Sequence, residues 1–140
     1  MVPKFRFFGK VADGEMRMVL AESIDFKNGF VYYSYNEYTV EGDEHVYGDL
    51  IGFEDCVLMQ STGLFDKNGV EIYEGDIVRY ECCFESYVEE VIYDDKHCNF
   101  GTIDKDEKTF SFDALISDFD VDCFEVVGNK YENPELLKGE

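Results

Sequence analysis

Two stretches of the sequence decide the fold prediction: LMQSTGLFDKNGVEIYEGDIVRY at Leu58–Tyr80 and VVGNKYENPELL at Val126–Leu137. In the first stretch, DKNG opens with an Asp whose side chain can accept a backbone N–H, and it ends with a Gly that tolerates positive φ. Two short alternating segments, EIY and IVRY, flank EGD at residues 74–76. The sequence EGDIV, in which glycine permits a sharp bend, is typical of the entry to a small SH3-like barrel.

The rest of the chain shows the same pattern of short strands and tight turns. Aromatic and β-branched residues at a period of two favour strands over helices, and Asp13-Gly14 and Asn28-Gly29 are turn signals. Further strands are predicted at Phe5–Phe8, Glu15–Leu20, Phe30–Tyr35, Phe53–Ser61, Tyr87–Tyr93, Phe100–Ile103, Thr109–Phe112 and Phe124–Val127. One helical turn is predicted over Pro134–Leu137 with Asn133 as its N-cap, and a second short helix is compatible with the sequence around Asp113–Ser117, because FDALI can present an apolar face.

These elements predict a mainly β protein packed as one compact unit. Residues 58–140 are expected to form an SH3-like β-barrel or β-meander, and residues 1–57 an N-terminal β extension. The acidic segment NEYTVEGDEHVYGDLIG at 36–52 carries three glycines and scattered apolar residues, so it is expected to be a long surface loop or a poorly paired hairpin. Hydrophobic residues form 45% of the chain, which is enough for a core and argues against wholesale disorder.

Charge limits the classes of partner. Twelve Lys and Arg residues stand against 32 Asp and Glu residues, which gives a formal charge of −20. A field of this sign repels phosphate backbones, so direct binding to nucleic acid or to an anionic membrane is disfavoured. Two interpretations of the charge remain: it keeps the protein soluble, or it mimics DNA and blocks a basic nucleic-acid-binding protein.

The five cysteines, an odd number, and the absence of a recognisable signal peptide indicate a reducing cytoplasm. Adjacent Cys82 and Cys83 are expected to point to opposite faces of a strand, and His97-Cys98 supplies only two groups. The acidic run DFDVD at 118–122 lacks the glycine and distal glutamate of a calcium loop. We therefore expect no metal, no cofactor and no catalytic residues, because no nucleophile or phosphate-binding motif appears either.

The two opening stretches, together with Lys4-Phe5-Arg6-Phe7, resemble the YopX-type proteins of bacteriophages and prophages of Gram-positive bacteria. The resemblance departs at Phe8-Gly9, where that family usually has a Trp-Asp pair, and over residues 36–52. It implies a mainly β, oligomeric phage or prophage protein with no established activity and no agreed catalytic residues. The positions singled out are therefore structural: Gly63, Asp66, Asn68, Gly69, Tyr73, Gly75, Asp76, Gly128, Asn129, Tyr131, Asn133 and Pro134.

We expect a non-enzymatic accessory protein of unknown function that acts through protein–protein contacts. The 13 Phe and 10 Tyr residues are many for one small domain to bury, which favours a homo-oligomer and contacts with a host or phage protein. The alternative is the acidic DNA mimic. The host, the partner and the biological role do not follow from the residues.

Overall fold

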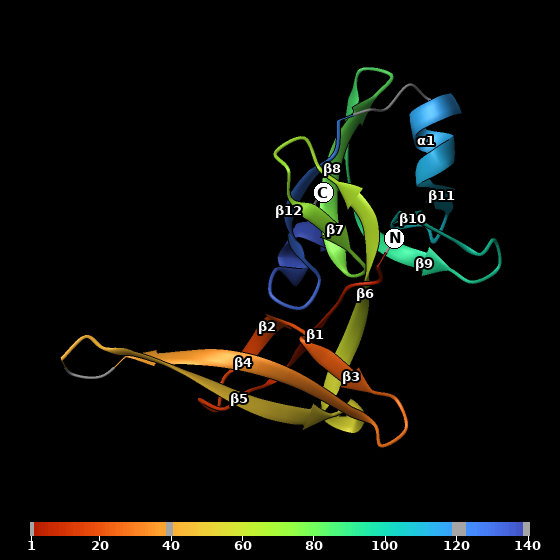
Figure 1. Cartoon of the computed structure of the whole chain (residues 1–140). Coiled ribbons are helices and arrows are strands. Elements are labelled where there is room, and N and C mark those ends of the chain that lie inside the picture. The colour runs from red at the N-terminus through yellow and green to blue at the C-terminus, as the bar shows by residue number, and fades with distance from the viewer. Residues whose placement is uncertain (1, 39–40, 119–122, 139–140) are drawn as a thin grey trace. The chain divides into compact units, whose positions relative to one another are not determined.

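Short strands joined by tight turns make up most of the protein (Figure 1). The structure is a computed structural model that describes residues 2–38, 41–118 and 123–138. It is mainly β, with 57% of residues in strands and 12% in helices, which confirms the predicted class. The strands are β1 Phe5–Lys10, β2 Met16–Leu20, β3 Ser23–Asp25, β4 Phe30–Tyr38, β5 Glu44–Gly52, β6 Cys56–Phe65, β7 Glu71–Tyr73, β8 Asp76–Cys82, β9 Glu85–Asp94, β10 Asn99–Ile103, β11 Thr109–Ser111 and β12 Glu125–Asn129. The helices are the 3₁₀ turns η1 Phe53–Asp55 and η2 Pro134–Lys138 and the α-helix α1 Phe112–Asp118.

The chain divides into two units, Val2–Gln60 and Ser61–Glu140. In the first unit, β1 lies between β2 and the first half of β6, and both pairings are antiparallel. β3, β4 and β5 form a second antiparallel sheet. The core of this unit consists of Phe7, Val31, Tyr33 and Ile51, and the Phe7 and Tyr33 rings meet edge to face with centroids 5.2 Å apart. The alternating aromatic and β-branched residues of β1 and β4 therefore place one face of each strand in the core.

The segment 36–52 is expected from its sequence to be a long surface loop or a poorly paired hairpin, and its described residues correct the loop, because residues 36–38 and 44–52 are well-paired strand. β4 and β5 pair in continuous antiparallel register from Phe30↔Gly52 to Tyr38↔Glu44 and form a long hairpin (Figure 1). Tyr35 and Tyr47 lie directly opposite each other, and their rings stack at 5.4 Å and 24°. Such cross-strand aromatic pairs stabilise a hairpin, and they outweigh the glycines and acids that suggested a loop.

The second unit is built on a curled, half-barrel sheet with strand order β11-β10-β9-β8-β12. All its neighbouring strands are antiparallel. Its core contains Ile72, Val78, Tyr80, Val91, Phe112, Leu115 and Phe124. Phe124 contacts both Phe112, edge to face at 5.1 Å, and Tyr80, at 5.2 Å. These aromatic contacts help hold α1 and the segment before β12 against the sheet.

The strands predicted over Thr109–Phe112 and from Phe53 have different boundaries in the structure. The strand expected over Thr109–Phe112 ends at Ser111, because the Ser111 hydroxyl accepts the backbone N–H of Ala114 at 3.0 Å and caps α1. The strand expected from Phe53 begins only at Cys56, after η1, and continues through Gly63 to Phe65. The pairing of β6 with β7 is irregular between Ser61 and Phe65.

Gly75 has the conformation that the EGD sequence predicts. It is buried and its φ is +85°, a value that L side chains rarely adopt. Its N–H donates to the carbonyl of Val91, and its own carbonyl accepts the N–H of Lys130. The neighbouring Asp76 is buried and accepts the N–H of Tyr73 at 2.8 Å. The bend between β7 and β8 is therefore bonded to both β9 and the end of β12.

Candidate functional site

The two segments singled out in the sequence meet in the second unit, at the turn between β6 and β7. One oxygen of Asp66 accepts the N–H groups of Asn68 and Val70, both at 2.8 Å. Its other oxygen accepts the N–H of Val126 at 2.9 Å, across 60 residues of sequence. Burial acts to raise the pKa of Asp66, but these three backbone donors outweigh it and leave the pKa lowered. We call this arrangement the Asp66 clamp; it joins the DKNG turn to β12.

The end of β12 forms a second network of structural bonds. Asn129 Oδ1 accepts the N–H groups of Tyr131 and Glu132, at 3.1 and 2.9 Å. Asn133 Oδ1 accepts the N–H of Asn129 at 3.2 Å, so the Asn133 side chain stabilises this turn. The N-cap prediction is corrected here, because it required this side chain to bond to the first turn of η2. A Cβ on Gly128 would lie 2.6 Å from that same oxygen. These residues shape the backbone, and their arrangement contains no reacting group.

The remaining predicted positions also lie in turns and strands of this unit. Gly63 has φ +80°, and its N–H donates to Ser61 Oγ at 3.0 Å. Gly69 has φ +81° at the turn that Asp66 opens. Tyr73 is buried at the end of β7, Tyr131 follows β12, and Pro134 is the first residue of η2. These positions lie in turns and strands, and the candidate binding site lies elsewhere in the unit.

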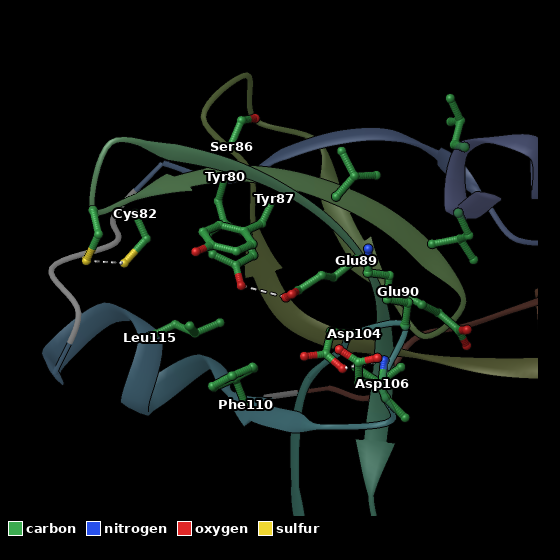
Figure 2. A pocket seen from close by; sticks show the side chains of 16 residues that line it. Tyr80, Cys82, Ser86, Tyr87, Glu89, Glu90, Asp104, Asp106, Phe110 and Leu115 are labelled. Atoms are coloured by element: carbon green, nitrogen blue, oxygen red, sulfur yellow. Dashed lines mark hydrogen bonds between the residues drawn. The ribbon is translucent and has the colours of Figure 1, made fainter. Parts of the chain in front are cut away.

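The candidate site is a cavity of about 710 Å³ inside the curled sheet (Figure 2). This volume is in the range that holds small-molecule ligands. Residues of β8, β9, β10, β11, α1 and η2 and of the turns between the strands line it: Tyr80, Cys82, Cys83, Ser86, Tyr87, Val88, Glu89, Glu90, Ile103, Asp104, Lys105, Asp106, Phe110, Leu115, Leu136 and Leu137. The Tyr80 and Tyr87 rings stack at 5.4 Å and 24°, and Leu115 lies across from them in Figure 2.

Glu89 is the central polar group of the cavity. Its side chain is only 4% exposed, and its Oε1 accepts the hydroxyls of Tyr80 at 2.5 Å and Thr102 at 2.8 Å. Burial, followed by the hydrogen bond to Glu89, raises the pKa of Tyr80, so the phenol keeps its proton and remains a donor. Sequence reasoning missed this group. The available signal was a carboxylate at an inward position of a strand, between Tyr87 and Val91.

The turn between β8 and β9 forms one end of the cavity and corrects the expectation for the cysteine pair. Cys83 and Phe84 have φ of +55° and +67°, so the chain reverses in two residues that both adopt left-handed conformations. The reversal brings Cys82 Sγ to 3.6 Å from Cys83 Sγ, although a straight strand would send them to opposite faces. The hydrogen bond with Cys83, followed by burial, raises the pKa of the Cys82 thiol. The Phe84 ring is fully exposed at the tip.

The other acidic and metal-type candidates give no site in the described residues. His97 Nδ1 is bonded to Asp94 Oδ2 at 2.7 Å, and Cys98 Sγ donates weakly to the Asp95 carbonyl at 3.8 Å. Of the DFDVD run, only Asp118 is described; residues 119–122 lie outside the described part of the chain. Over the described ranges, no three His, Cys, Asp or Glu side chains come close enough to hold a metal ion together. None of the helices described is long and apolar enough to cross a membrane.

Fold and cavity together define a small, mainly β protein whose curled sheet, with α1 and η2, lines a ligand-sized cavity that carries four carboxylates. The family model described as "YopX protein" matches residues 4–138, so the chain belongs to the YopX protein family. The chain is also similar to a solved structure, "Crystal structure of protein EF1440 from Enterococcus faecalis". The sequence identity is 29% and the TM-score 0.59, over 98% of this chain and 99% of the other. No curated protein matches the chain.

Proposed function

We propose that this YopX family member is a non-enzymatic accessory protein, encoded by a phage or prophage, that acts through protein–protein contacts in the bacterial cytoplasm. Its partners are a host or phage protein and further copies of itself. One observation carries the proposal: the ring of Phe84 is fully exposed at the tip of the β8–β9 turn. An aromatic ring in water is unfavourable by itself, and such rings are enriched at protein interfaces.

The backbone of the same turn supports this reading. Two-residue turns of this kind normally use Asn-Gly or Asp-Gly, because both residues need positive φ. Here Cys83 and Phe84 occupy these positions, at a cost on the order of 1 kcal/mol for each residue. Backbone strain of this kind persists mainly where it has a use. Presenting Phe84 to a partner is such a use.

The non-enzymatic part of the proposal is supported by the chemistry of the cysteines. Burial, followed by the charge of Asp55, raises the pKa of Cys56, and the bond to Cys83 raises that of Cys82. A raised thiol pKa leaves little thiolate at neutral pH, and the thiolate is the nucleophile. These two thiols are therefore poorly suited to covalent catalysis.

A capture experiment with a matched control tests the proposal. Wild-type protein, Phe84→Ser and Phe65→Ser are immobilised and exposed to bacterial lysate, and bound proteins are identified by mass spectrometry. Phe65 is the control because its ring is also exposed, at 59%, but lies on β6. A specific partner should be captured by wild type and Phe65→Ser, be lost with Phe84→Ser, and survive high salt. Equal capture by all three proteins would contradict the role of Phe84.

The self-association part has its own measurement. Light scattering at low and high salt should show an oligomer whose affinity rises with salt, because salt screens the repulsion between chains of charge −20. A monomer at both salt concentrations would contradict self-association.

The DNA mimic stays as a second candidate because of that same charge. A mimic would bind a basic host protein through its carboxylates, and its affinity would fall steeply with salt. In the capture experiment, a partner that DNA displaces and moderate salt removes, whatever residue stands at position 84, would favour the mimic over the aromatic contact.

A further inference from the structure

The cavity of the second unit contains an acceptor that the protein itself leaves unused. Within the described residues, both hydroxyl donors to Glu89 bind the same atom, Oε1, and Oε2 receives no hydrogen bond. Glu89 lines the cavity although its side chain is 96% buried. Glu89 Oε2 is not fully enclosed, and within the described residues this unpaired oxygen keeps some surface open to the cavity. A ligand that enters the cavity can therefore bring a donor directly to this oxygen.

The charges around the cavity indicate which kind of donor fits. Four carboxylates line it, from Glu89, Glu90, Asp104 and Asp106, and only one ammonium, from Lys105. Glu90 is paired with Lys130 at 3.1 Å, and Asp104 accepts two backbone N–H groups of its own turn. Glu89 Oε2 has neither a paired ammonium group nor backbone N–H donors within the described residues. A cation is therefore favoured at this oxygen over a neutral donor.

Most of the remaining lining side chains are apolar or aromatic. Tyr80 and Tyr87 stack on one side, and Phe110, Leu115 and the two leucines of η2 complete the surface. Flat apolar groups pack well against such rings, and an organic cation gains further from their π faces. Size, charge and apolar surface thus describe one kind of ligand.

We propose that this cavity binds a small organic cation, with an ammonium or amidinium head on Glu89 Oε2 and a flat apolar body between the tyrosine pair and Leu115. The ligand is a free small molecule held inside the second unit. The proposal concerns a different surface from the Phe84 contact and does not depend on it.

Protein-observed NMR titration tests the site with three probes of nearly the same shape. Phenethylamine carries the cation, 2-phenylethanol is its neutral counterpart, and phenylacetate is the anion. Phenethylamine should cause saturable shifts in the amides of β8, β9 and β10, 2-phenylethanol should bind at least about tenfold more weakly, and phenylacetate should not bind. Equal affinities for the amine and the alcohol, shifts outside these strands, or no saturation would overturn the proposal.

Two glutamates that each accept a tyrosine hydroxyl provide a matched pair of variants. Glu89→Gln keeps an acceptor for Tyr80 and Thr102 but places a neutral amide in the cavity. This variant should bind phenethylamine at least about tenfold more weakly than the wild type. Glu85→Gln removes a carboxylate that accepts the Tyr87 hydroxyl at 2.9 Å and does not line the cavity. The affinity of Glu85→Gln for phenethylamine should equal that of the wild type. Equal affinity of Glu89→Gln and wild type would overturn the role of Glu89.

A further variant and a further probe cover the remaining outcomes. Should Glu89→Gln fail to fold, Leu137→Trp fills the cavity from η2 and should abolish phenethylamine binding; retained binding would overturn the proposal. The peptide acetyl-Ala-Arg-Ala-amide presents a cationic side chain of a protein. It should bind more weakly than phenethylamine, and tighter binding would overturn the assignment to a free small molecule.

Discussion

Two turns of the second unit have nearly the same local structure and differ in what they hold together. In DKNGV, at 66–70, Asp66 Oδ1 accepts the N–H groups two and four residues later, and its own N–H donates to the carbonyl of Val70. In DKDEK, at 104–108, Asp104 makes the same three bonds, at 2.8, 2.9 and 3.0 Å. The fourth residue has positive φ in both, +81° at Gly69 and +64° at Glu107.

The difference between the turns is the second carboxylate oxygen. Asp66 Oδ2 accepts the N–H of Val126, and the next residue, Lys67, donates its N–H to the carbonyl of Phe124. Within the described residues, Asp104 bonds only inside its own turn. Asp66 is 8% exposed, whereas Asp104 is half-buried. One local motif can therefore serve as a simple chain reversal or as a long-range clamp, and only the partner strand distinguishes them.

The largest expected effect is from removing the clamp. Asp66→Ala leaves the N–H groups of Asn68, Val70 and Val126 without their acceptor in a largely buried setting, which should lower the free energy of unfolding by about 4 kcal/mol. The matched change Asp104→Ala should lower the free energy of unfolding by about 1 kcal/mol, as the loss of a local capping group does. Denaturant unfolding followed by tyrosine near-UV circular dichroism measures both values. Equal losses would show that the Val126 bond contributes nothing.

The next effect is a pH dependence that follows from the lowered pKa of Asp66. A carboxylate whose pKa is lower in the folded protein stabilises it above the unfolded value, 3.8, and this stabilisation is lost as pH falls through the folded pKa. The stability difference between wild type and Asp66→Asn should thus stay constant from about pH 7 to pH 5 and shrink below about pH 4. Urea unfolding at several pH values measures it, and a difference that grows on acidification would contradict the ionised clamp.

A smaller effect is expected from the glycine of the first turn. Gly69→Ala places a side chain at φ +81°, and its Cβ would meet no atom within 4 Å, so only backbone strain acts. The expected loss is about 1 kcal/mol. Because the added methyl group touches nothing, a much larger loss in denaturant unfolding would mean that the turn itself changes conformation.

The smallest effect should have the opposite sign. Glu107→Gly relieves the strain at φ +64° but increases the freedom of the unfolded chain, so the free energy of unfolding should rise by about 0.5 kcal/mol. The same unfolding measurement detects it, with Glu107→Ala as the control that keeps the strained conformation. A loss of stability in Glu107→Gly would show that the Glu107 side chain has a role of its own.

The sequence predicted the DKNG turn, the bend at Gly75 and most strands, because local turn chemistry and alternation determine them. It also indicated the short helices at both predicted places. It did not indicate the long-range bond of Asp66, since nothing near residue 66 specifies Val126. The same limit applied to the pairing of Tyr35 with Tyr47, which was hidden among acids and glycines, and to Cys83, whose left-handed conformation no local preference predicts.

The candidate site was harder to predict for a physical reason. A cavity is defined by residues that the curl of the sheet brings together, and Tyr80, Glu89 and Thr102 come from three different strands. Each is ordinary in its own segment. Only Glu89 could have been noticed in the sequence, because it is an acid at a strand position where the alternation of apolar and polar residues predicts an apolar one.

The Asp66 clamp also has a consequence for the order of events during folding. The bond to Val70 closes a span of four residues, whereas the bond to Val126 closes a span of 60. This is about four doublings of loop length, which adds roughly 2.4 kcal/mol of closure entropy. The turn can thus form early, with Oδ1 of Asp66 already hydrogen-bonded. Oδ2 receives its bond only when β12 has formed. During synthesis, Asp66 leaves the ribosome before Val126 has been added to the chain or soon after, so the bond between them can form only late.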